Sequence, residues 1–539
     1  FHSHTDTEVL LTAYIHWGQA LLTHLVGMFA FAILDTQKQT LFLARDFFGI
    51  KPLYYTQWEN GFAFASEIKA LLQLPQINRN INPQRLYDFL TCGLTDTGSE
   101  TLLTSIQQIP AAHCLEISLI QPKEAIAQRS ATRCPPKRYW HINTEQTLDI
   151  SFTEAAAQCR EIFLENINLH LRSDVPVGVA LSGGVDSSSI VMAMRYLNPD
   201  QEIHSFSYTA EDPSVNEESW IDLVVKAAQT CSHKTQPTPQ ELIQDLDRLI
   251  DTQDEPFGST SIYAQHRVFR LAQQNGIKVM LDGQGADELL GGYYPYLAAR
   301  LASLLRQGKW LKARQFFEKI CQFPGASQYP FFKQALGLFL PLSLKAEIKT
   351  YLGRPSFPLW LNRHWFEQHQ VKNSSIPRLK GQDLLKAQLL QSLDTSLLGL
   401  LRYEDRNSMA HSLESRVPFL TPKLVNFLFS LPEDHIVSPD STTKAVFREA
   451  MRGILPDPIC TRRDKIGFAT PELNWLTTLD PWVKSILNSE MAHTIPVLNI
   501  HFIQQEWQSI LEQKTPFDFR VWRWLNLIKW AEKNQITFE

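Results

Sequence analysis

A run of small and polar residues in the middle of the chain has the composition of a phosphate-binding loop. The run is Ser182-Gly183-Gly184-Val185-Asp186-Ser187-Ser188. Its two glycines permit unusual backbone angles, so that amide N–H groups can converge on an anion, and a following helix N-terminus and the serine hydroxyls add further donors. No lysine follows the glycines, so the run is not a Walker A loop. The alternative is a plain strand–helix turn with a good helix cap.

A second run, at residues 281–293, combines four glycines with two adjacent acidic residues. It reads Leu-Asp-Gly-Gln-Gly-Ala-Asp-Glu-Leu-Leu-Gly-Gly-Tyr. We expect it at the carboxyl end of a sheet strand, where the ligands of parallel sheets gather. In that position Asp287 would share a Mg²⁺ ion with Asp186, because Mg²⁺ prefers oxygen ligands. The alternative is that Asp287 and Glu288 only cap the next helix.

Two charged clusters follow these runs. Residues 401–420 mix acidic and basic side chains, and residues 444–449 and 462–468 are rich in lysine and arginine. Ion pairs within a helix would account for part of the first cluster, and a solvent-exposed face would account for the second. Beside a phosphate-binding loop, however, the basic residues are candidates to clamp pyrophosphate.

The elements expected around these runs form a parallel sheet covered by helices. Apolar strands are predicted at 175–181, 203–208 and 278–281, and helices at 152–171, 187–196 and 217–229. Such alternation is typical of a parallel sheet with helices on its faces. After about residue 295 nearly the whole chain is predicted to be helical.

The first 120 residues are predicted to form a compact, strand-rich unit. A helix is expected at 9–17 and strands at 29–34, 40–44 and 62–65,. A stretch with three prolines and scattered charges, residues 121–146, is the best linker candidate,.

The composition excludes several classes of protein. The 539 residues carry 51 basic and 56 acidic side chains, a net charge of −5, so the chain lacks the basic field that gathers nucleic acid. The seven cysteines form no C-x-x-C pair, which favours reduced cytoplasmic thiols over a disulfide scaffold or a zinc ribbon. No apolar stretch is long enough to span a bilayer, and no signal peptide opens the chain. We therefore expect a cytoplasmic protein without nucleic-acid or membrane partners.

In order and spacing, the four runs resemble the synthetase domain of the glutamine-hydrolysing asparagine synthetase family. The resemblance covers about residues 140–475, and the segments 5–10, 27–32, 44–54 and 65–69 resemble the later part of that family's glutaminase domain. It implies an α/β protein. Residues 1–135 would be an α+β remnant of an N-terminal-nucleophile hydrolase. Residues 145–539 would be a parallel-sheet ATP pyrophosphatase domain, similar to adenine nucleotide hydrolases, with a largely helical extension.

The resemblance also implies a reaction and a set of site residues. The enzyme would bind ATP and Mg²⁺, adenylate the aspartate side chain, release pyrophosphate and form asparagine with ammonia from glutamine. ATP and pyrophosphate would be held by Leu181, Ser182, Gly183, Gly184, Asp186, Ser187, Ser188, Tyr208, Asp282 and Gly283. Asp186 and Asp287 would bind the metal, and Lys444, Asp287 and Gln284 would stand at the reacting centre, with Lys444 stabilising negative charge.

This sequence departs from the family pattern at its glutaminase half. In the family a cysteine at the mature N-terminus attacks glutamine. Here the chain starts at Phe1, and of the glutamine pocket only Asp6 remains, at the position that holds the glutamine α-amine. We therefore expect an incomplete glutaminase half without glutaminase activity in this chain.

A second departure is Gln284, where asparagine synthetases usually carry a glutamate thought to assist the attack of ammonia. A neutral amide cannot act as a general base. Either a neighbour does so, or the acceptor is another carboxylate: a sugar acid, a peptide, or a substrate with an internal amine as in β-lactam synthetases. A non-catalytic ATP-binding relative is the third hypothesis. The sequence leaves the oligomeric state open, a homodimer included.

Overall fold

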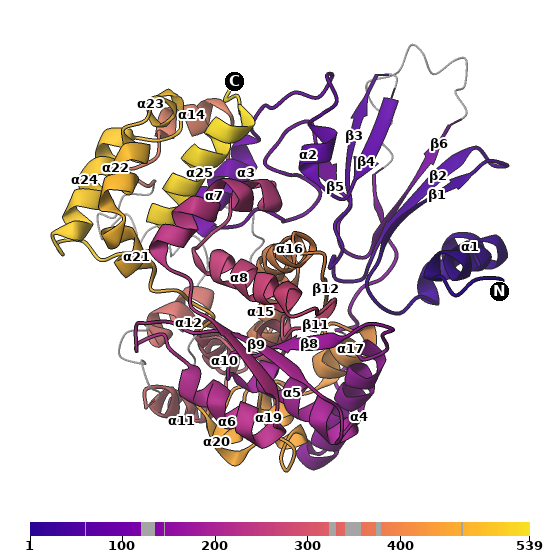
Figure 1. Cartoon of the computed structure of the whole chain (residues 1–539). Coiled ribbons are helices and arrows are strands. Elements are labelled where there is room, and N and C mark those ends of the chain that lie inside the picture. Colours follow the sequence, from indigo (N-terminus) through magenta and orange to yellow (C-terminus); the bar gives the residue numbers. More distant parts are fainter. Residues whose placement is uncertain are drawn as a thin grey trace.

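The computed structural model describes residues 1–59, 61–119, 135–144, 146–322, 330–339, 357–372, 379–464 and 467–539. Its centre is a five-stranded parallel sheet in the order β10-β9-β8-β11-β12 (Figure 1). The strands are β8 (Val177–Ala180), β9 (His204–Tyr208), β10 (Cys231–Thr235), β11 (Val279–Leu281) and β12 (Glu414–Arg416). Val179 of β8 lies beside Ser205 of β9 on one side and Leu281 of β11 on the other.

The strand order creates a switch point between β8 and β11. From β8 the chain moves outward through β9 to β10, and then returns to the other side of β8 with β11. Helical crossovers between short, buried parallel strands give this doubly wound arrangement. Such sheets bind ligands in the crevice outside the carboxyl ends of the strands at the switch point. Both glycine-containing runs of the sequence follow these two strands.

Helices cover both faces of the sheet. α4 (Phe152–His170), α5 (Val185–Leu197) and α6 (Glu218–Ala228) lie on one face, and α8 (Ser261–Gln274) lies on the other (Figure 1). α4 starts at a capping box, in which the side chains of Ser151 and Glu154 each accept a hydrogen bond from the other's backbone N–H,. The apolar face of α5 is fully buried; it consists of Ile190, Val191, Ala193 and Met194.

The N-terminal part of the chain forms two antiparallel sheets that pack face to face. The first has the order β1-β2-β6-β7 and the second β4-β3-β5. Their strands are β1 (Ala30–Asp35), β2 (Thr40–Arg45), β3 (Tyr54–Trp58), β4 (Gly61–Ala65), β5 (Gln107–Gln108), β6 (His113–Ser118) and β7 (Lys137–Arg138). Leu43, Tyr55 and Leu115 are buried between the sheets. α1 (Asp6–Trp17) covers the outer face through Tyr14, which stacks on Phe42.

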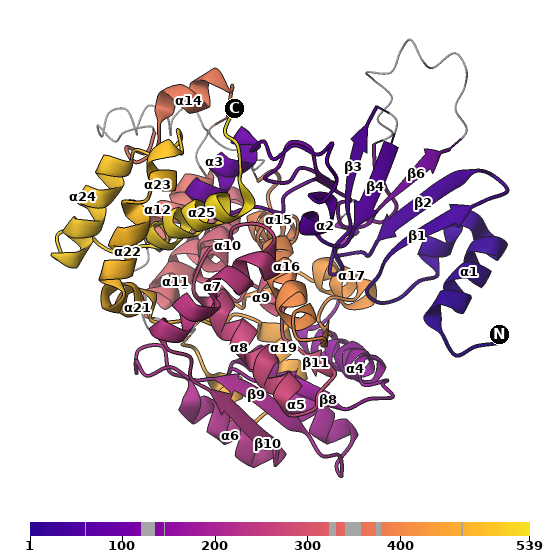
Figure 2. The same cartoon turned by 45° about the horizontal axis from the view of Figure 1, so that its top comes forward.

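The last helices of the chain pack beside the N-terminal unit. α25 (Arg520–Asn534) lies against α3 (Pro83–Cys92) and α22 (Asp480–Leu487) (Figure 2). Trp522, Trp524 and Trp530 of α25 are almost fully buried. The backbone N–H of Ile81 donates to the carbonyl of Thr537 at 2.9 Å. The C-terminal end of the chain therefore closes back onto the N-terminal part.

The other helices complete the mostly helical second half and the connections. They are η1 (Gly18–Thr23), α2 (Ile68–Leu71), α7 (Pro239–Gln253), α9 (Ala286–Leu290), α10 (Tyr294–Arg306), α11 (Trp310–Ile320), α12 (Phe331–Phe339), α14 (Arg363–Gln368), α15 (Leu384–Leu393), α16 (Ser396–Met409), α17 (Pro422–Ser430), α18 (Glu433–Ile436), α19 (Ala445–Ala450), α20 (Asp457–Thr461), α21 (Glu472–Thr478), α23 (Glu490–Thr494) and α24 (Ile500–Leu511). Within the described residues, no helix has the length and apolar character needed to cross a bilayer.

Charges of the cluster at 401–420 connect α16 to the N-terminal unit. Arg402 Nε lies 3.1 Å from Asp96 Oδ2, and Lys51 Nζ lies 2.8 Å from Asp405 Oδ1. Both α16 residues are buried. Their partners come from distant parts of the chain, so pairing within the helix does not account for these charges.

The structure confirms an α/β fold and also contains elements that were not expected, among them the strands β3, β6, β7, β10 and β12 and the helices α7 and α8. β10 is not predicted, because its residues Cys-Ser-His-Lys-Thr lack the apolar alternation of a half-buried strand, as an edge strand allows,. β12 interrupts the part expected to be helical; three residues are too few for a periodic signal. In the expected linker, residues 137–138 form β7, while 121–134 and 145 lie outside the described residues.

Candidate active site

A cavity of about 610 Å³ opens at the carboxyl ends of β8 and β11. Its volume is that of a small-molecule pocket, and it lies at the switch point of the sheet. Most of the residues predicted from the sequence line it, namely Leu181, Ser182, Gly184, Asp186, Ser187, Tyr208, Asp282, Gly283, Gln284, Asp287 and Lys444.

Three predicted residues do not line this cavity. Ser188 is completely buried inside α5, and Gly183 turns its carbonyl to Arg462. Asp6 lies exposed in the first turn of α1, in the N-terminal unit. The structure therefore gathers most of the residues predicted to bind nucleotide and metal around one cavity and keeps Asp6, the residue predicted to bind glutamine, apart from them on α1 (Figure 1).

The loop after β8 curls around two serine hydroxyls. The backbone N–H of Ser182 donates to Ser187 Oγ at 3.1 Å, and the Ser182 and Ser187 hydroxyl oxygens are also 3.1 Å apart. α5 then begins at Val185, after the N-cap residue Gly184, which has no side chain to cap the helix. The first N–H groups of this thirteen-residue helix therefore remain available to an anion, which the positive end of the helix dipole favours.

Gly183 has to be glycine for two reasons. Its φ is +77°, in the left-handed region that side chains disfavour,. A Cβ atom there would lie 2.6 Å from Trp220 Cβ and 2.9 Å from the backbone nitrogen of Ile221. The loop thus lies directly against α6, at a distance that only glycine allows.

Arg462, which comes from a much later part of the chain, holds this loop in its conformation. Its Nη1 donates to the Gly183 carbonyl at 3.1 Å, and its Nη2 lies 2.8 Å from Glu217 Oε1. The guanidinium also lies 4.7 Å from the ring centre of Trp220, within the range of a cation–π contact. Arg462, which belongs to the basic segment 462–468, lines the cavity and at the same time holds the loop in shape.

A lysine lies between the two carboxylates predicted to bind the metal. Lys444 Nζ is 2.6 and 2.5 Å from the two oxygens of Asp186 and 2.5 Å from Asp287 Oδ1. All three side chains are largely buried. The carboxylates therefore converge on one positive charge at the mouth of the serine–glycine loop.

The backbone at Lys444 has an unusual conformation, and a glycine approaches its side chain closely. Lys444 has φ +56° and ψ +31°, a left-handed conformation that costs a residue with a side chain about 1–2 kcal/mol,. It is the N-cap of α19, and its backbone N–H donates to the Leu290 carbonyl at 3.1 Å. A Cβ atom on Gly292 would lie 1.8 Å from Asp287 Oδ1 and 2.6 Å from Lys444 Cε. Strained residues of this kind cluster at functional sites.

A second, buried pair of carboxyl groups stands beside Gln284. Asp282 accepts hydrogen bonds from the backbone N–H groups of Gly283 and Gln284, but burial raises its pKa to about 6. Glu404 of α16 contacts Asp282, and burial together with the Asp282 charge raises the pKa of Glu404 well above its usual value. Hydrogen bonds from Ser415 and from the Gln284 side chain oppose this rise. Burial therefore raises the pKa of each of these two carboxyl groups.

The sequence did not single out Glu404. It stands in the run 401–420, where nothing in its neighbours distinguishes it from the other charges. Its position depends on the packing of α16 against α8 and β12, and Gln265 of α8 and Ser415 of β12 both donate hydrogen bonds to its carboxyl group. Proximity to Gln284 became visible only in three dimensions.

Fold and site define a class: a doubly wound α/β protein whose switch-point cavity combines an anion-binding loop with two carboxylates and a lysine. Comparison with known families is consistent with this. A family model described as asparagine synthase matches residues 158–532, and one described as a glutamine amidotransferase domain matches residues 1–128. The chain belongs to the asparagine synthase family, as the four sequence runs predicted.

Relatives match nearly the whole chain. It is 28% identical to asparagine synthetase (glutamine-hydrolyzing) 3 of Bacillus subtilis, over 92% of this chain and 76% of that protein. It is 27% identical to asparagine synthetase (glutamine-hydrolyzing) 1 of the same organism, over 99% of this chain and 82% of that protein. It is also 24% identical to amidase chry2 of Gibberella zeae, over 94% of this chain and 78% of that protein.

Proposed function

We propose that this chain is an ATP-dependent asparagine synthetase. A carboxylate oxygen of aspartate attacks the α-phosphorus of ATP, and the bond to the departing pyrophosphate breaks. Ammonia derived from glutamine then attacks the activated carbonyl carbon, AMP leaves with the electrons of the C–O bond, and loss of a proton gives the amide. The observation that carries this proposal is Lys444, held between Asp186 and Asp287 at the mouth of the serine–glycine loop.

The loop residues have the task of holding the leaving group. Ser182 and Ser187 offer hydroxyls, and the first N–H groups of α5 point to the end of the helix at which anions bind,. Adenylation does not need covalent help from the protein, so its rate depends on positioning and on neutralising charge. We assign the pyrophosphate to this loop and the nucleotide to the neighbouring Leu181, Tyr208 and Gly283, with Asp282 beside them.

The donor set suits a magnesium ion. Oxygens of Asp186 and Asp287 both lie within 2.6 Å of one positive nitrogen, so the two carboxylates already face a common cation, and oxygen ligands are those Mg²⁺ prefers. Bound with ATP, Mg²⁺ would neutralise phosphate charge. The Lys444 ammonium would then donate to the charge that develops on the α-phosphate, from a backbone position that its left-handed conformation fixes.

A different acceptor carboxylate is the second candidate. The observation that favours it is the hydrogen bond from the Gln284 side chain to Glu404, which lies beside Asp282. In this chain an amide stands where the resemblance leads us to expect a carboxylate, so the acceptor side of the cavity carries one negative charge less. A sugar acid or a peptide carboxylate would fit such a site as well as aspartate does.

Pyrophosphate release tests the chemistry. With ATP, Mg²⁺, ammonia and aspartate, the chain should release pyrophosphate, and Asp186→Asn and Asp287→Asn should each lower the rate by a hundredfold or more (about 3 kcal/mol). Asp200→Asn, at an exposed residue away from the cavity, is the matched control and should retain full activity. Equal activity of the Asp186 variant and this control would contradict the proposal.

The acceptor is tested separately, with aspartate, glutamate and a uronic acid as substrates for the parent chain and for Gln284→Glu. Robust, aspartate-specific turnover by the parent would support asparagine synthesis. Turnover with another carboxylate, and a raised KM for it in Gln284→Glu because of the new negative charge, would support the second candidate. Pyrophosphate release with none of these acceptors would argue against both.

The proposal also divides the chain. We assign residues 1–135 to the glutamine amidotransferase part, with Asp6 on the glutamine α-amine, and residues 145–539 to the synthetase part. Asp6→Ala tests the first assignment through the binding of glutamine, which can be measured without its hydrolysis. The variant should bind glutamine more weakly than the parent and should release pyrophosphate with ammonia at the parent's rate.

A further inference from the structure

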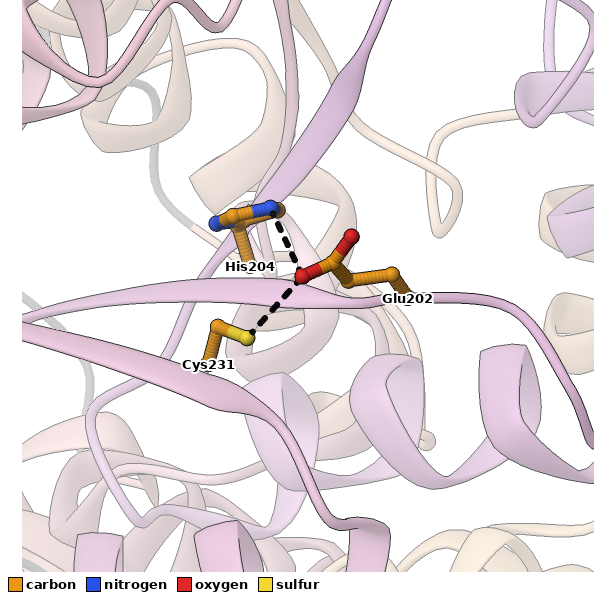
Figure 3. A group of neighbouring side chains, drawn as sticks. All are labelled: Glu202, His204 and Cys231. Atoms are coloured by element: carbon orange, nitrogen blue, oxygen red, sulfur yellow. Dashed lines mark hydrogen bonds and ion pairs between the residues drawn. The ribbon is translucent and has the colours of Figure 1, made fainter.

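Three side chains of types that bind metals lie together at the amino-terminal ends of two strands, on the opposite side of the sheet from the end at which the active-site cavity opens. Glu202 stands just before β9, His204 begins β9 and Cys231 begins β10 (Figure 3). We call these three residues the strand-start cluster. Because the strands are parallel, their amino-terminal ends lie together, away from the carboxyl ends at which the cavity opens. The cluster therefore belongs to a separate place on the molecule.

The register of the two strands brings the ligand atoms together. His204 and Cys231 are direct partners across the β9–β10 pair. Cys231 Sγ lies 3.3 Å from Glu202 Oε1, and His204 Nε2 lies 3.8 Å from the same oxygen (Figure 3). All three residues offer a donor atom within 4.8 Å of the others. In a tetrahedral zinc site, with bonds of about 2.0–2.3 Å, neighbouring donor atoms lie about 3.3–3.6 Å apart. Two of the donor distances in the cluster, 3.3 and 3.8 Å, are close to these values.

A fourth residue orients the histidine. His204 Nδ1 lies 3.1 Å from His233 Nε2, and the two rings are nearly parallel. With the shared hydrogen on Nδ1 of His204, its Nε2 carries the free lone pair and faces Glu202. Histidines that bind metals characteristically donate the N–H of their second ring nitrogen to a hydrogen-bond acceptor, which fixes the tautomer and the ring orientation, and His233 Nε2 offers such an acceptor here. His233 in turn stacks on the buried Phe206, so the arrangement is anchored in the core.

We propose that Glu202, His204 and Cys231 bind a divalent transition-metal ion of the zinc class, with His233 as the positioning residue behind His204. The thiolate and imidazole ligands select zinc, cobalt or nickel over Mg²⁺ and Ca²⁺, which take oxygen ligands. In the structure the Cys231 thiol donates its hydrogen to Glu202. When the metal binds, the S–H bond breaks, a metal–sulfur bond forms and one proton is released to solvent. Exposure of Glu202 and Cys231 leaves room for water as the fourth ligand.

The ion would strengthen the edge of the sheet. β10 is the edge strand, and its polar sequence offers few apolar contacts to hold it. A metal that binds residues before β9 and at the start of β10 ties this strand to its neighbour. Ligands that bind only the folded state stabilise it. The expected consequence is a metal-dependent rise in the temperature of unfolding, without an effect on the chemistry in the distant cavity.

Cobalt binding tests the proposal, because a thiolate ligand gives Co²⁺ a charge-transfer absorption that carboxylates alone do not. The full chain is titrated with Co²⁺ in the presence of excess Mg²⁺, which competes for sites made of carboxylates alone. One Co²⁺ per chain should produce this absorption, Zn²⁺ should abolish it, and one proton should be released per ion. Cys231→Ser should lose the band, whereas Cys92→Ser, at another exposed cysteine, should keep it.

Further variants separate ligation from a chance thiol contact. His204→Gln and Glu202→Gln should weaken Co²⁺ binding tenfold or more, and His233→Phe should weaken it by about tenfold, as for other partners of metal-bound histidines. Zn²⁺ should raise the unfolding temperature of the parent and not of Cys231→Ser, while both release pyrophosphate at the same rate. The absence of a thiolate band, the same band in Cys231→Ser, or unchanged affinity in His204→Gln would each overturn the proposal.

Discussion

Lys444 Nζ lies within 2.6 Å of both carboxylate oxygens of Asp186, although the two residues are 258 positions apart in the chain. Such a buried pair, with Asp287 as a second anion at 2.5 Å, is held in place by the fold. Removing one partner of a buried pair leaves an uncompensated charge. Substitution of Lys444 therefore tests both its proposed role in catalysis and its contribution to the structure of the site.

Lys444→Met keeps much of the side-chain volume and removes the charge. If the ammonium neutralises charge that develops during adenylation, kcat for pyrophosphate release should fall about a hundredfold or more, with a much smaller change in the KM for ATP. Lys444→Arg should not restore the rate, because a planar guanidinium does not place its charge where a compact ammonium does. Steady-state assays of the three proteins measure this. Near-normal turnover of the Met variant would remove Lys444 from the reacting centre.

Gly292→Ala should damage the site more than the fold. The new Cβ would lie 1.8 Å from Asp287 Oδ1 and 2.6 Å from Lys444 Cε, and both side chains are able to move aside. We expect pyrophosphate release to fall at least about tenfold, since small misplacements at a reacting centre are costly, with a change in unfolding free energy of roughly 1 kcal/mol. Gly258→Ala, where a Cβ meets nothing within 4 Å, serves as control. Full activity of the Gly292 variant would show that this close approach is unimportant.

Gly183→Ala and Gly184→Ala should differ sharply. Gly183 combines φ +77° with a Cβ contact of 2.9 Å to the backbone of Ile221, whereas the closest atom to a Cβ on Gly184 is Ser182 Oγ at 3.4 Å. Left-handed strain of about 1–2 kcal/mol and the clash together predict a loss of at least about 2 kcal/mol for the first variant. The second should lose less than about 1 kcal/mol. Urea unfolding gives both values, and equal losses would refute the argument.

Glu472→Gln should change how stability depends on pH. Burial raises the pKa of Glu472 to about 7, and its carboxyl group accepts hydrogen bonds from Thr260 N at 2.7 Å and Oγ1 at 3.0 Å. The folded state thus binds the proton more tightly than the unfolded chain, in which the pKa is near 4.5. Its stabilising contribution is fully present below pH 4.5 and is lost as the pH rises through 7.

Relative to Glu472→Gln, the parent should therefore lose about 2–3 kcal/mol of unfolding free energy between pH 5 and pH 8, because one pKa unit corresponds to about 1.4 kcal/mol. Unfolding in urea at both pH values gives the difference. Glu165→Gln, at an exposed glutamate, should follow the parent at both. A parent and a Glu472 variant with parallel pH profiles would contradict the assigned shift.

Several features of the fold and site could be predicted from the sequence alone. The strands β8, β9 and β11, the helices α4, α5 and α6 and the two glycine runs have local signals: apolar stretches, helix starts and residues that permit special backbone angles. Because parallel strands end at one edge of a sheet, placing Asp186 and Asp287 together followed from topology. The basic segment 444–449 was visible in the sequence, and the family resemblance added the specific role of Lys444.

Other features were decided by tertiary structure. Glu404 reaches Gln284 only because α16 packs against α8 and β12, and β12 is a three-residue strand without a periodic signal. The strand-start cluster depends on the pairing of β10 with β9, and β10 is an edge strand whose polar sequence does not predict a strand. Local composition determines which segments become strands and helices. Which distant side chains meet is determined by strand order and register, and these are set by the burial of the whole sheet.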